Sequence, residues 1–228
     1  MAFIVKNTTF SGLADMICPH SCIGCGVLGT ALCECCKKDI LLNHTNYCPN
    51  CKRLITQTRC EYCQLPPSFM VGWRDDLVGR LVHELKYHST RVLAGELAEI
   101  LAEILPTIDG EVAVVPLPTI RRHVRERGLN HTVLIAKKLA RKRGWAVKNI
   151  LTRTKDTVQV GTDELTRRAQ AKEAYGLSGE KIDPEMTYVL FDDVWTTGAS
   201  MRAALKKLRK AGAVKIVIAV LAVNRVQH

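Results

Sequence analysis

The 228-residue sequence predicts an α/β fold with a parallel sheet, preceded by a small cysteine-rich module. After residue 66, apolar runs of strand length alternate with segments whose apolar residues recur at helical spacing, a pattern typical of a parallel sheet covered on both faces. Before residue 66, four Cys-x-x-Cys pairs follow one another with few large apolar residues between them. We therefore divide the chain into residues 1–65 and 66–228, with Pro66-Pro67 as the linker.

The elements of the second part follow from apolar periodicity and from prolines. Leu77–Tyr87 has the helical spacing, and the next helix ends before Pro106 because proline cannot continue it. The longest apolar run, Ile216–Val223, indicates a buried strand. The expected strands are Phe69–Trp73, Glu111–Val115, Trp145–Ile150, 187–192 and 214–223, and the expected helices are Leu77–Tyr87, Val92–Leu105, Leu129–Arg143 and 199–211.

Charge and hydropathy restrict the function classes. The net charge is +11, and residues 121–155 alone hold twelve Lys or Arg against one acid, Glu126. Such basicity favours a polyanionic partner, either nucleic acid or an anionic membrane surface. A hydrophobic content of 47% excludes wholesale disorder. No apolar run reaches membrane-spanning length, and Met1–Phe10 lacks the apolar core of a secretory signal, so we expect a cytoplasmic protein.

The cysteine spacing predicts two structural zinc sites. Eight thiolates in four knuckles match two tetrahedral Cys₄ sites with no open position, although iron–sulfur clusters or free thiols are alternatives. Tandem pairing gives two small zinc ribbons, and an interleaved pairing of the first knuckle with the third stays open. Cys18 and Cys35 are left over and are expected to be bystanders. The predicted ligands are Cys22, Cys25, Cys33, Cys36, Cys48, Cys51, Cys60 and Cys63.

Residues 189–200 read Val-Leu-Phe-Asp-Asp-Val-Trp-Thr-Thr-Gly-Ala-Ser. An apolar strand ends in two carboxylates, and a small hydroxyl-rich turn then leads into a helix. Backbone N–H groups of Thr196 to Ser200 can cradle a phosphate at the helix N-terminus. Asp192 and Asp193 lie at the carboxyl end of the strand and suit ribose hydroxyls as hydrogen-bond acceptors. The stretch predicts a ribose 5-phosphate site and is not a Walker loop, because no Gly-Lys-Ser/Thr follows.

This stretch closely resembles the 5-phosphoribosyl 1-pyrophosphate (PRPP) signature of type I phosphoribosyltransferases. Several further features occur in order along nearly the whole chain, and together they resemble the ComF family of bacterial competence proteins, the ComFC and GntX-like group. Two positions depart from the family pattern, since His131 replaces a usual Gln and Gln170 a usual Asn. The matching features are the eight-cysteine module, Leu-Lys-Tyr-His (85–88), Val-Pro-Leu-Pro (115–118), Arg-Glu-Arg-Gly-Leu-Asn (125–130), Gln159, Arg167 and Tyr175.

The resemblance implies a type I phosphoribosyltransferase-like domain after a double zinc ribbon, and PRPP binding with Mg²⁺. Asp192 and Asp193 would hold the ribose hydroxyls. Lys86 and Arg122 would act as catalytic cations on the leaving pyrophosphate, although a solvated surface is the alternative for both. A backbone N–H of Leu117 would contact the pyrophosphate. The 5-phosphate would be held by Thr196, Thr197, Gly198, Ala199 and Ser200.

Three functions of different classes stay open. The first is binding of single-stranded DNA during DNA uptake for natural transformation, with Trp195 as the best candidate for stacking on a base. The second is an active phosphoribosyltransferase in nucleotide salvage or modification. A third is an adaptor whose zinc ribbons dock a competence helicase or an inner-membrane channel, at the inner face of the membrane. The expected DNA contacts are Arg121, Arg122, Arg125, Arg127, Lys137 and Arg141.

Overall fold

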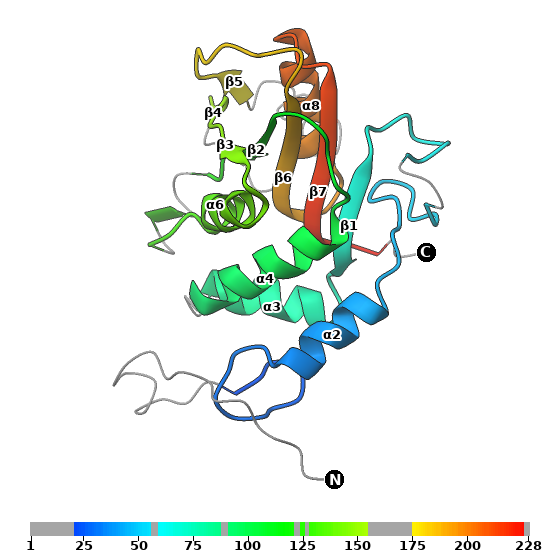
Figure 1. Cartoon of the computed structure of the whole chain (residues 1–228), viewed down its shortest axis with the longest axis vertical. Helices are drawn as coiled ribbons and strands as arrows, with labels where there is room; N and C mark the ends of the chain where they lie inside the picture. Colours follow the sequence, from blue (N-terminus) through cyan, green and yellow to red (C-terminus); the bar gives the residue numbers. More distant parts are fainter. Residues whose placement is uncertain are drawn as a thin grey trace, which may run out of the picture.

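The computed structural model describes residues 21–55, 59–87, 91–120, 124–125, 128–154 and 175–225. Its centre is a five-stranded sheet in the order β1-β7-β6-β2-β3 (Figure 1). Every neighbouring pair in this sheet is parallel, which confirms the predicted fold class. The five strands are β1 (Ser68–Trp73), β2 (Val112–Pro116), β3 (Ala146–Val147), β6 (Thr187–Trp195) and β7 (Lys215–Val223).

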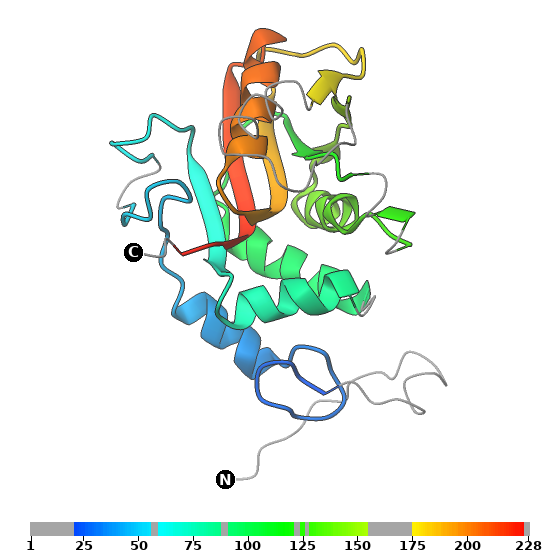
Figure 2. The same cartoon turned by 180° about the vertical axis from the view of Figure 1, so that it is seen from behind.

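Helices cover both faces of the sheet (Figures 1 and 2). Along β6, Val189 and Phe191 face the core shared with α3, α4 and α6, whereas Tyr188 and Leu190 face the core shared with α8. Because both faces are buried, the strands are near-continuous apolar runs. The helices are α3 (Leu77–Tyr87), α4 (Arg91–Ile104), α6 (His131–Arg143) and α8 (Ala199–Lys210). None of the described helices is long and apolar enough to cross a membrane.

The structure differs from the predicted elements in four features. The strand expected at Trp145–Ile150 is shorter: only β3 pairs with β2, and the chain then turns away into β4 (Leu151–Arg153). β4 pairs antiparallel with β5 (Tyr175–Leu177) in a separate two-stranded sheet. β6 continues to Trp195, because β7 is long enough to pair with it up to Val223. A helix in the cysteine-rich part, α2 (Glu34–Leu42), was not predicted.

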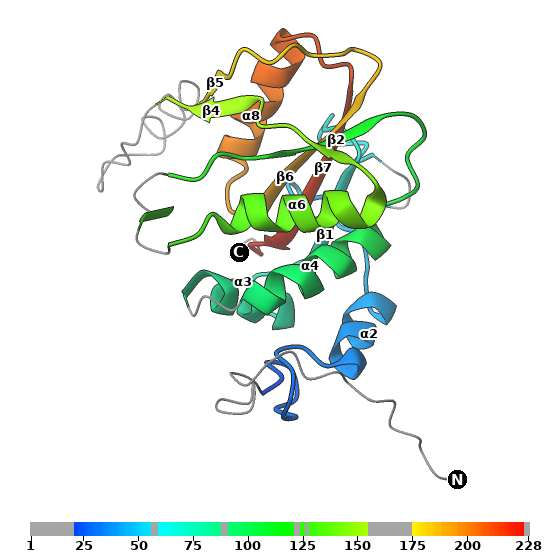
Figure 3. The same ribbon diagram turned by 60° about the vertical axis from the view of Figure 1, so that its left-hand side comes forward.

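The cysteine-rich part packs on both faces of the α/β part. Cys22, with Ala31 and Leu32, joins the core of α3 and α4, whereas Cys48 and Cys60 join the core of α8. In Figures 1 and 3, the chain before α2 lies beside α3 and α4, and the chain after α2 runs alongside β1. The division of the chain at residue 65 stays a prediction.

Lys37 joins α2 to α4 through a cluster of carboxylates. Its Nζ lies 2.6 Å from Glu96 Oε2, 2.9 Å from Glu99 Oε2 and 2.9 Å from Glu34 Oε1. Burial alone lowers the pKa of Lys37, but hydrogen bonds to the three glutamates outweigh it and raise the pKa. The same contact, together with Lys142, lowers the pKa of Glu99. The cluster therefore holds α2 of the cysteine-rich module against α4.

We predict that Lys37→Met lowers the free energy of unfolding by about 1–3 kcal/mol, because Glu96 and Glu99 would then face each other with one cation fewer. Urea unfolding of the zinc-loaded chain measures this loss. The pKa of Glu99 is lowered in the fold, so the stability from its pairing is present above the usual glutamate value of 4.5 and is lost as the pH falls below it. The difference between wild type and variant should therefore shrink in acid.

Lys215→Met is the matched control, because Lys215 Nζ pairs with Glu185 Oε2 at 2.9 Å but both side chains are at least half exposed. An exposed pair contributes about 0.5 kcal/mol or less. Equal losses in the two variants would contradict a structural role for the Lys37 cluster.

Candidate functional site

The predicted phosphate turn lies between β6 and α8. Gly198 precedes the first residue of α8 and has a φ of 72°, in the left-handed region. A Cβ at this position would also overlap the ring of Trp195, so glycine is required on both counts. Thr196, Thr197 and Ser200 are exposed. The turn therefore exposes hydroxyl side chains at a helix N-terminus, where the Ala199 N–H donates only a long hydrogen bond to Thr197 Oγ1 at 3.4 Å, an arrangement that suits an anion.

The two aspartates lie inside β6 and are partly buried. Asp193 Oδ2 pairs with Lys86 Nζ at 2.8 Å, and these side chains are 15% and 16% exposed. Asp192 Oδ1 accepts the Asp193 N–H at 2.9 Å. Burial, followed by the charge of Asp193, raises the pKa of Asp192 well above its usual range, although the Asp193 N–H and Lys86 act in the opposite direction. Lys86 is thus the counter-ion of the acidic pair.

Local sequence fixes the position of Lys86. Asp76 caps the start of α3, because its Oδ1 accepts the Val78 N–H at 2.8 Å and its Oδ2 accepts the Trp73 N–H at 2.8 Å. Lys86 lies in the last turn of the same helix, where a cation is favoured by the helix dipole. The amphipathic helix α3 therefore places Lys86, in its last turn, next to the carboxyl end of β6.

A cavity of about 330 Å³ opens at the carboxyl ends of β2 and β6. The acidic pair, Lys86 and Ser200 line one side of it. Tyr175 and Arg153 of the small β4-β5 sheet line another, with the guanidinium Cζ 5.7 Å from the centre of the tyrosine ring. Burial, with the charge of Asp192, raises the pKa of Tyr175, while hydrogen bonds of Ser200 and Arg153 act against it. The remaining wall consists of Leu117, Pro118, Thr119, Ile120, Thr132 and Val194.

The structure brings most of the predicted ligand-binding residues together. Lys86, Leu117 and Ser200 share the cavity with the acidic pair, and the turn Thr196–Ala199 adjoins it. The Leu117 N–H donates to Phe191 O at 2.9 Å, so it is not open to a pyrophosphate as predicted. Leu117 contributes to the wall of the cavity instead. Arg121, Arg122 and Arg127 lie outside the described residues.

Among the described residues, the predicted nucleic-acid contacts lie on the surface and do not line the cavity. Arg125, Lys137 and Arg141 are exposed. Thr132 lines the cavity, and a helix rises about 1.5 Å per residue, so Arg141 lies roughly 14 Å further along α6. Trp195 is only 2% exposed, and its ring packs beneath Gly198, so the prediction that it stacks on bases is wrong.

Arg153 and Thr132 were missed as cavity residues by sequence reasoning. Arg153 belongs to a three-residue strand whose partner lies more than twenty residues further on. Strands of that length have no periodicity to detect. Thr132 follows the helix cap Asn130, whose Oδ1 accepts the Val133 N–H at 3.2 Å. The cap signal was present in the sequence and would have placed Thr132 in the first turn of a helix beside the Pro116–Pro118 loop.

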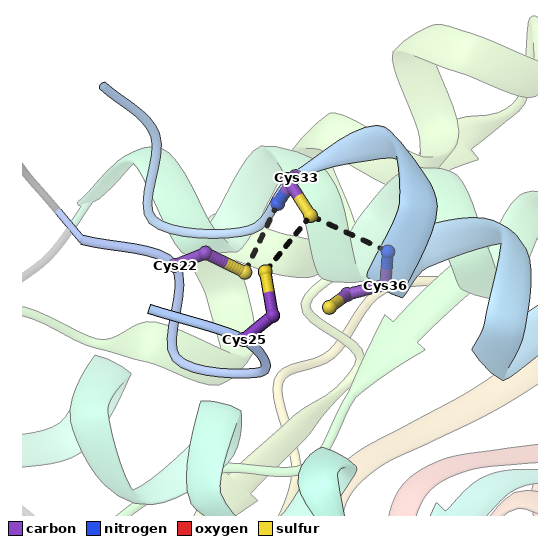
Figure 4. A group of neighbouring side chains, drawn as sticks. All are labelled: Cys22, Cys25, Cys33 and Cys36. Carbon is purple, nitrogen blue, oxygen red and sulfur yellow. Dashed lines mark hydrogen bonds between the residues drawn. The ribbon is translucent and has the colours of Figure 1, made fainter. Parts of the chain in front are cut away.

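The cysteines form two clusters that can each hold a zinc ion. Within each cluster the four sulfurs lie within 4.8 Å of one another, which establishes sequential pairing of the knuckles and rules out the interleaved alternative for these residues. Figure 4 shows the first cluster. Cys35 is exposed and belongs to neither cluster, and Cys18 lies outside the described residues. The clusters are Cys22, Cys25, Cys33 and Cys36, and Cys48, Cys51, Cys60 and Cys63.

Backbone N–H groups donate hydrogen bonds to two sulfurs of the first cluster. Cys22 Sγ accepts the Cys33 N–H at 3.3 Å, and Cys33 Sγ accepts the Cys36 N–H at 3.4 Å (Figure 4). Burial raises the pKa of Cys22, but hydrogen bonds from backbone amides outweigh it and bring the pKa to about 6. Burial also raises the pKa of Cys60, but hydrogen bonds from the Tyr62 backbone amide and from the side chains of Cys51 and Cys48 outweigh it and bring the pKa to about 7. All-sulfur tetrahedral sets of this kind fit structural zinc.

The fold and the site together define an α/β protein with a parallel sheet, a candidate ribose-phosphate cavity and two Cys₄ clusters. No family model matches the chain. The chain is 27% identical over 219 residues to Competence protein F of Haemophilus influenzae. The alignment covers 86% of this chain and 93% of that relative. This similarity confirms the resemblance to the ComF family inferred from the sequence. A solved structure of the allosteric regulatory enzyme of purine biosynthesis matches 56% of this chain at 15% identity and a TM-score of 0.39, and the match spans 25% of that enzyme's length.

We predict that the purified chain carries two zinc ions and that Cys22→Ser carries one, because three thiolates bind zinc much less tightly than four. Metal content by atomic absorption, together with protein concentration, measures the ratio. Cys35→Ser is the control, since this thiol is exposed and outside both clusters. Loss of an ion in the control, or retention of two ions in Cys22→Ser, would contradict the assignment of ligands.

Proposed function

We propose that this protein binds PRPP or a related ribose 5-phosphate, and that it binds single-stranded DNA during DNA uptake for natural transformation. The observation that carries the proposal is the meeting of Asp192, Asp193 and the phosphate turn at one cavity. Two partly buried carboxylates suit neighbouring hydroxyls, and a glycine-containing helix N-terminus suits a phosphate. A ribose 5-phosphate carries both groups within the span of one sugar.

Different residues of the site would bind the 5-phosphate, the ribose hydroxyls and the pyrophosphate. N–H groups of the turn Thr196–Ser200 would take the 5-phosphate, and Asp192 and Asp193 would accept hydrogen bonds from the ribose hydroxyls. The Lys86 ammonium has three N–H donors, so it can retain its ion pair with Asp193 and also donate to a pyrophosphate oxygen. Arg153 supplies a second cation on another wall. Mg²⁺ prefers oxygen ligands of this kind, and when bound it would neutralise the pyrophosphate.

Three observations support the DNA part of the proposal. The chain has a net charge of +11, exposed cations line α6, and the matched relative is named for competence. Contacts from lysine and arginine to phosphates dominate such binding and make it salt-dependent. Because aromatics make up only 5% of the chain and Trp195 is buried, base stacking should contribute little.

A second candidate is an active phosphoribosyltransferase in nucleotide salvage or modification. It is favoured by the presence of Lys86 and Arg153 on the cavity walls, where two cations would stabilise the charge that develops on a leaving pyrophosphate. Arg122, outside the described residues, is proposed as a third. Docking of a helicase or a membrane channel at the inner face of the membrane, by the cysteine-rich module, is a further proposal that rests on the family resemblance.

We predict opposite effects of Asp192→Asn on binding and on stability. PRPP affinity should fall at least about tenfold, because a charged acceptor of the ribose hydroxyls is lost. The melting temperature without ligand should rise by about 2–4 °C, the effect of ~1 kcal/mol in a chain of this size. The raised pKa of Asp192 means that its protonated form stabilises the fold, and this contribution is lost as the pH rises through that pKa. The higher melting temperature of Asp192→Asn should therefore be present at neutral pH and vanish in acid, where Asp192 of the wild type is protonated.

Calorimetric titration with PRPP and Mg²⁺, and thermal scans across pH, test both effects. Asp75→Asn is the control, since Asp75 is exposed and pairs only at the surface with Arg225 Nε at 3.0 Å. For wild type, PRPP affinity should also fall as the pH drops through the raised pKa of Asp192. Unchanged PRPP binding by Asp192→Asn would refute the assignment of the ribose site.

We predict that the double variant Lys137→Gln/Arg141→Gln weakens single-stranded DNA binding and lowers the salt slope of log K by about 1.4, from ~0.7 for each lost phosphate contact. Fluorescence anisotropy of a labelled oligonucleotide across a salt series measures the slope. Arg209→Gln/Lys210→Gln removes the same charge from the exposed end of α8 and should leave the slope unchanged. Equal slopes in both double variants would show that α6 is not the DNA surface.

A further inference from the structure

The second cysteine cluster is connected to the phosphate turn by three consecutive hydrogen bonds. Asn50 Nδ2 donates to Cys63 Sγ at 3.2 Å. Arg202 Nη1 donates to Asn50 Oδ1 at 2.7 Å, and Arg202 Nη2 donates to the Thr197 carbonyl at 2.6 Å. A metal-ligand sulfur, one amide and one guanidinium thus link two parts of the chain that lie about 150 residues apart.

The Thr197 carbonyl is a sensitive place to hold the turn. A trans peptide directs its C=O and its N–H to opposite sides, so the direction of the Thr197 carbonyl sets the direction of the Gly198 N–H. Gly198 has no side-chain restraint on its own backbone, and its φ of 72° is a conformation from which glycine moves easily. By binding the carbonyl on one side, Arg202 keeps the Gly198 N–H directed to the other side. The hydrogen bond from Arg202 therefore restrains the orientation of this peptide.

Asn50 depends on the metal cluster for its own position. It lies inside the knuckle Cys48-Pro49-Asn50-Cys51, and its amide donates to a sulfur from the next knuckle. A knuckle of this size has too small a core to keep its shape without the cross-link that a metal supplies. Hydrogen bonds to ligating atoms also orient metal ligands, and the loss of such bonds changes metal-site properties measurably.

The first cluster has no comparable connection among the described residues. It packs on α3 and α4, and its neighbouring polar link is Lys37 with the glutamates of α4. The second cluster instead packs with Met201, Ala204 and Leu205 of α8, the helix that begins at the turn. The two sites therefore differ in what they support, although their ligand sets are identical.

We propose that the second Cys₄ site positions the phosphate turn through Asn50 and Arg202, so that loading of this site, and not of the first, sets the affinity for a phosphate ligand. The inference rests on the proposed function for the identity of the ligand. Asn50 and Arg202 are positioning residues: they act on the Thr197–Gly198 peptide and not on the ligand itself.

Three asparagine variants separate the steps of the connection. Asn50→Ala removes both of its hydrogen bonds and should lower PRPP affinity on the order of fivefold while two zinc ions remain bound. Asn50→Asp keeps an acceptor for Arg202 but has no donor for Cys63, so PRPP affinity should fall to a value between those of wild type and Asn50→Ala. Asn43→Ala is the control, because Asn43 Nδ2 contacts only Asp39, on α2.

Two readouts distinguish positioning from a general loss of structure. Hydrogen exchange of the amides Gly198–Arg202 should be faster in Asn50→Ala than in wild type, without any ligand, and unchanged in Asn43→Ala. In the cobalt-substituted protein, PRPP should shift the thiolate–cobalt absorption of wild type and should not shift that of Asn50→Asp, in which the last bond to sulfur is absent.

Metal-ligand variants give a second test. Cys63→Ser should lower PRPP affinity at least as much as Asn50→Ala, and Cys22→Ser should leave it within about twofold of wild type. Equal affinities for wild type and Asn50→Ala, together with unchanged exchange at Gly198–Arg202, would overturn the inference. If wild type fails to bind PRPP while exchange in Asn50→Ala is still faster, the proposed ligand is wrong and the positioning of the turn stands.

Discussion

The ion pair between Lys86 and Asp193 is the interaction on which the candidate site depends. β6 carries two adjacent carboxylates at the edge of a core, where burial and mutual repulsion raise the pKa of Asp192. Lys86 Nζ lies 2.8 Å from Asp193 Oδ2, so the pair joins α3 to the end of the strand and supplies a cation to the two carboxylates. A buried carboxylate with a raised pKa costs stability, and perturbed carboxylates of this kind cluster at functional sites, which is why the proposed ribose site is placed there.

The two cysteine clusters replace an apolar core that the cysteine-rich part lacks. Cys22 is buried with α3 and α4 on one face of the sheet, and Cys48 and Cys60 are buried with α8 on the other. Each cluster therefore packs against a different face of the sheet. Lys37 strengthens the first of these contacts, and Arg202 with Asn50 strengthens the second.

Local chemistry was predictable from the sequence, and long-range assembly was not. The acidic pair, the glycine turn and the helix after it are consecutive residues, so their order alone indicated a ribose-phosphate site. The wall formed by Arg153 and Tyr175 depends on pairing between two three-residue strands, which leaves no periodic signal. Trp195 was misassigned because its neighbours are polar, whereas its own place at the end of β6 lets the ring turn inward beneath Gly198. The cysteine spacing gave the ligands but allowed two pairings, which only the three-dimensional positions of the sulfurs distinguish.

The basic segment also shows why a charge count overstates the surface that is open to a polyanion. Arg143 donates to the carbonyls of Ala102 and Leu105 at 2.8 and 3.0 Å and so caps the C-terminal end of α4, and Lys142 pairs with Glu99 at 3.1 Å. These two cations belong to the packing of α4 against α6. Lys137 and Arg141 stay exposed on α6, and the helical rise places them roughly 8 Å and 14 Å along the axis from Thr132 at the cavity. The screening length at physiological salt is about 8 Å, so a phosphate of DNA at Arg141 would interact only weakly with a ribose phosphate at β6, whereas one at Lys137 would lie within reach of its charge.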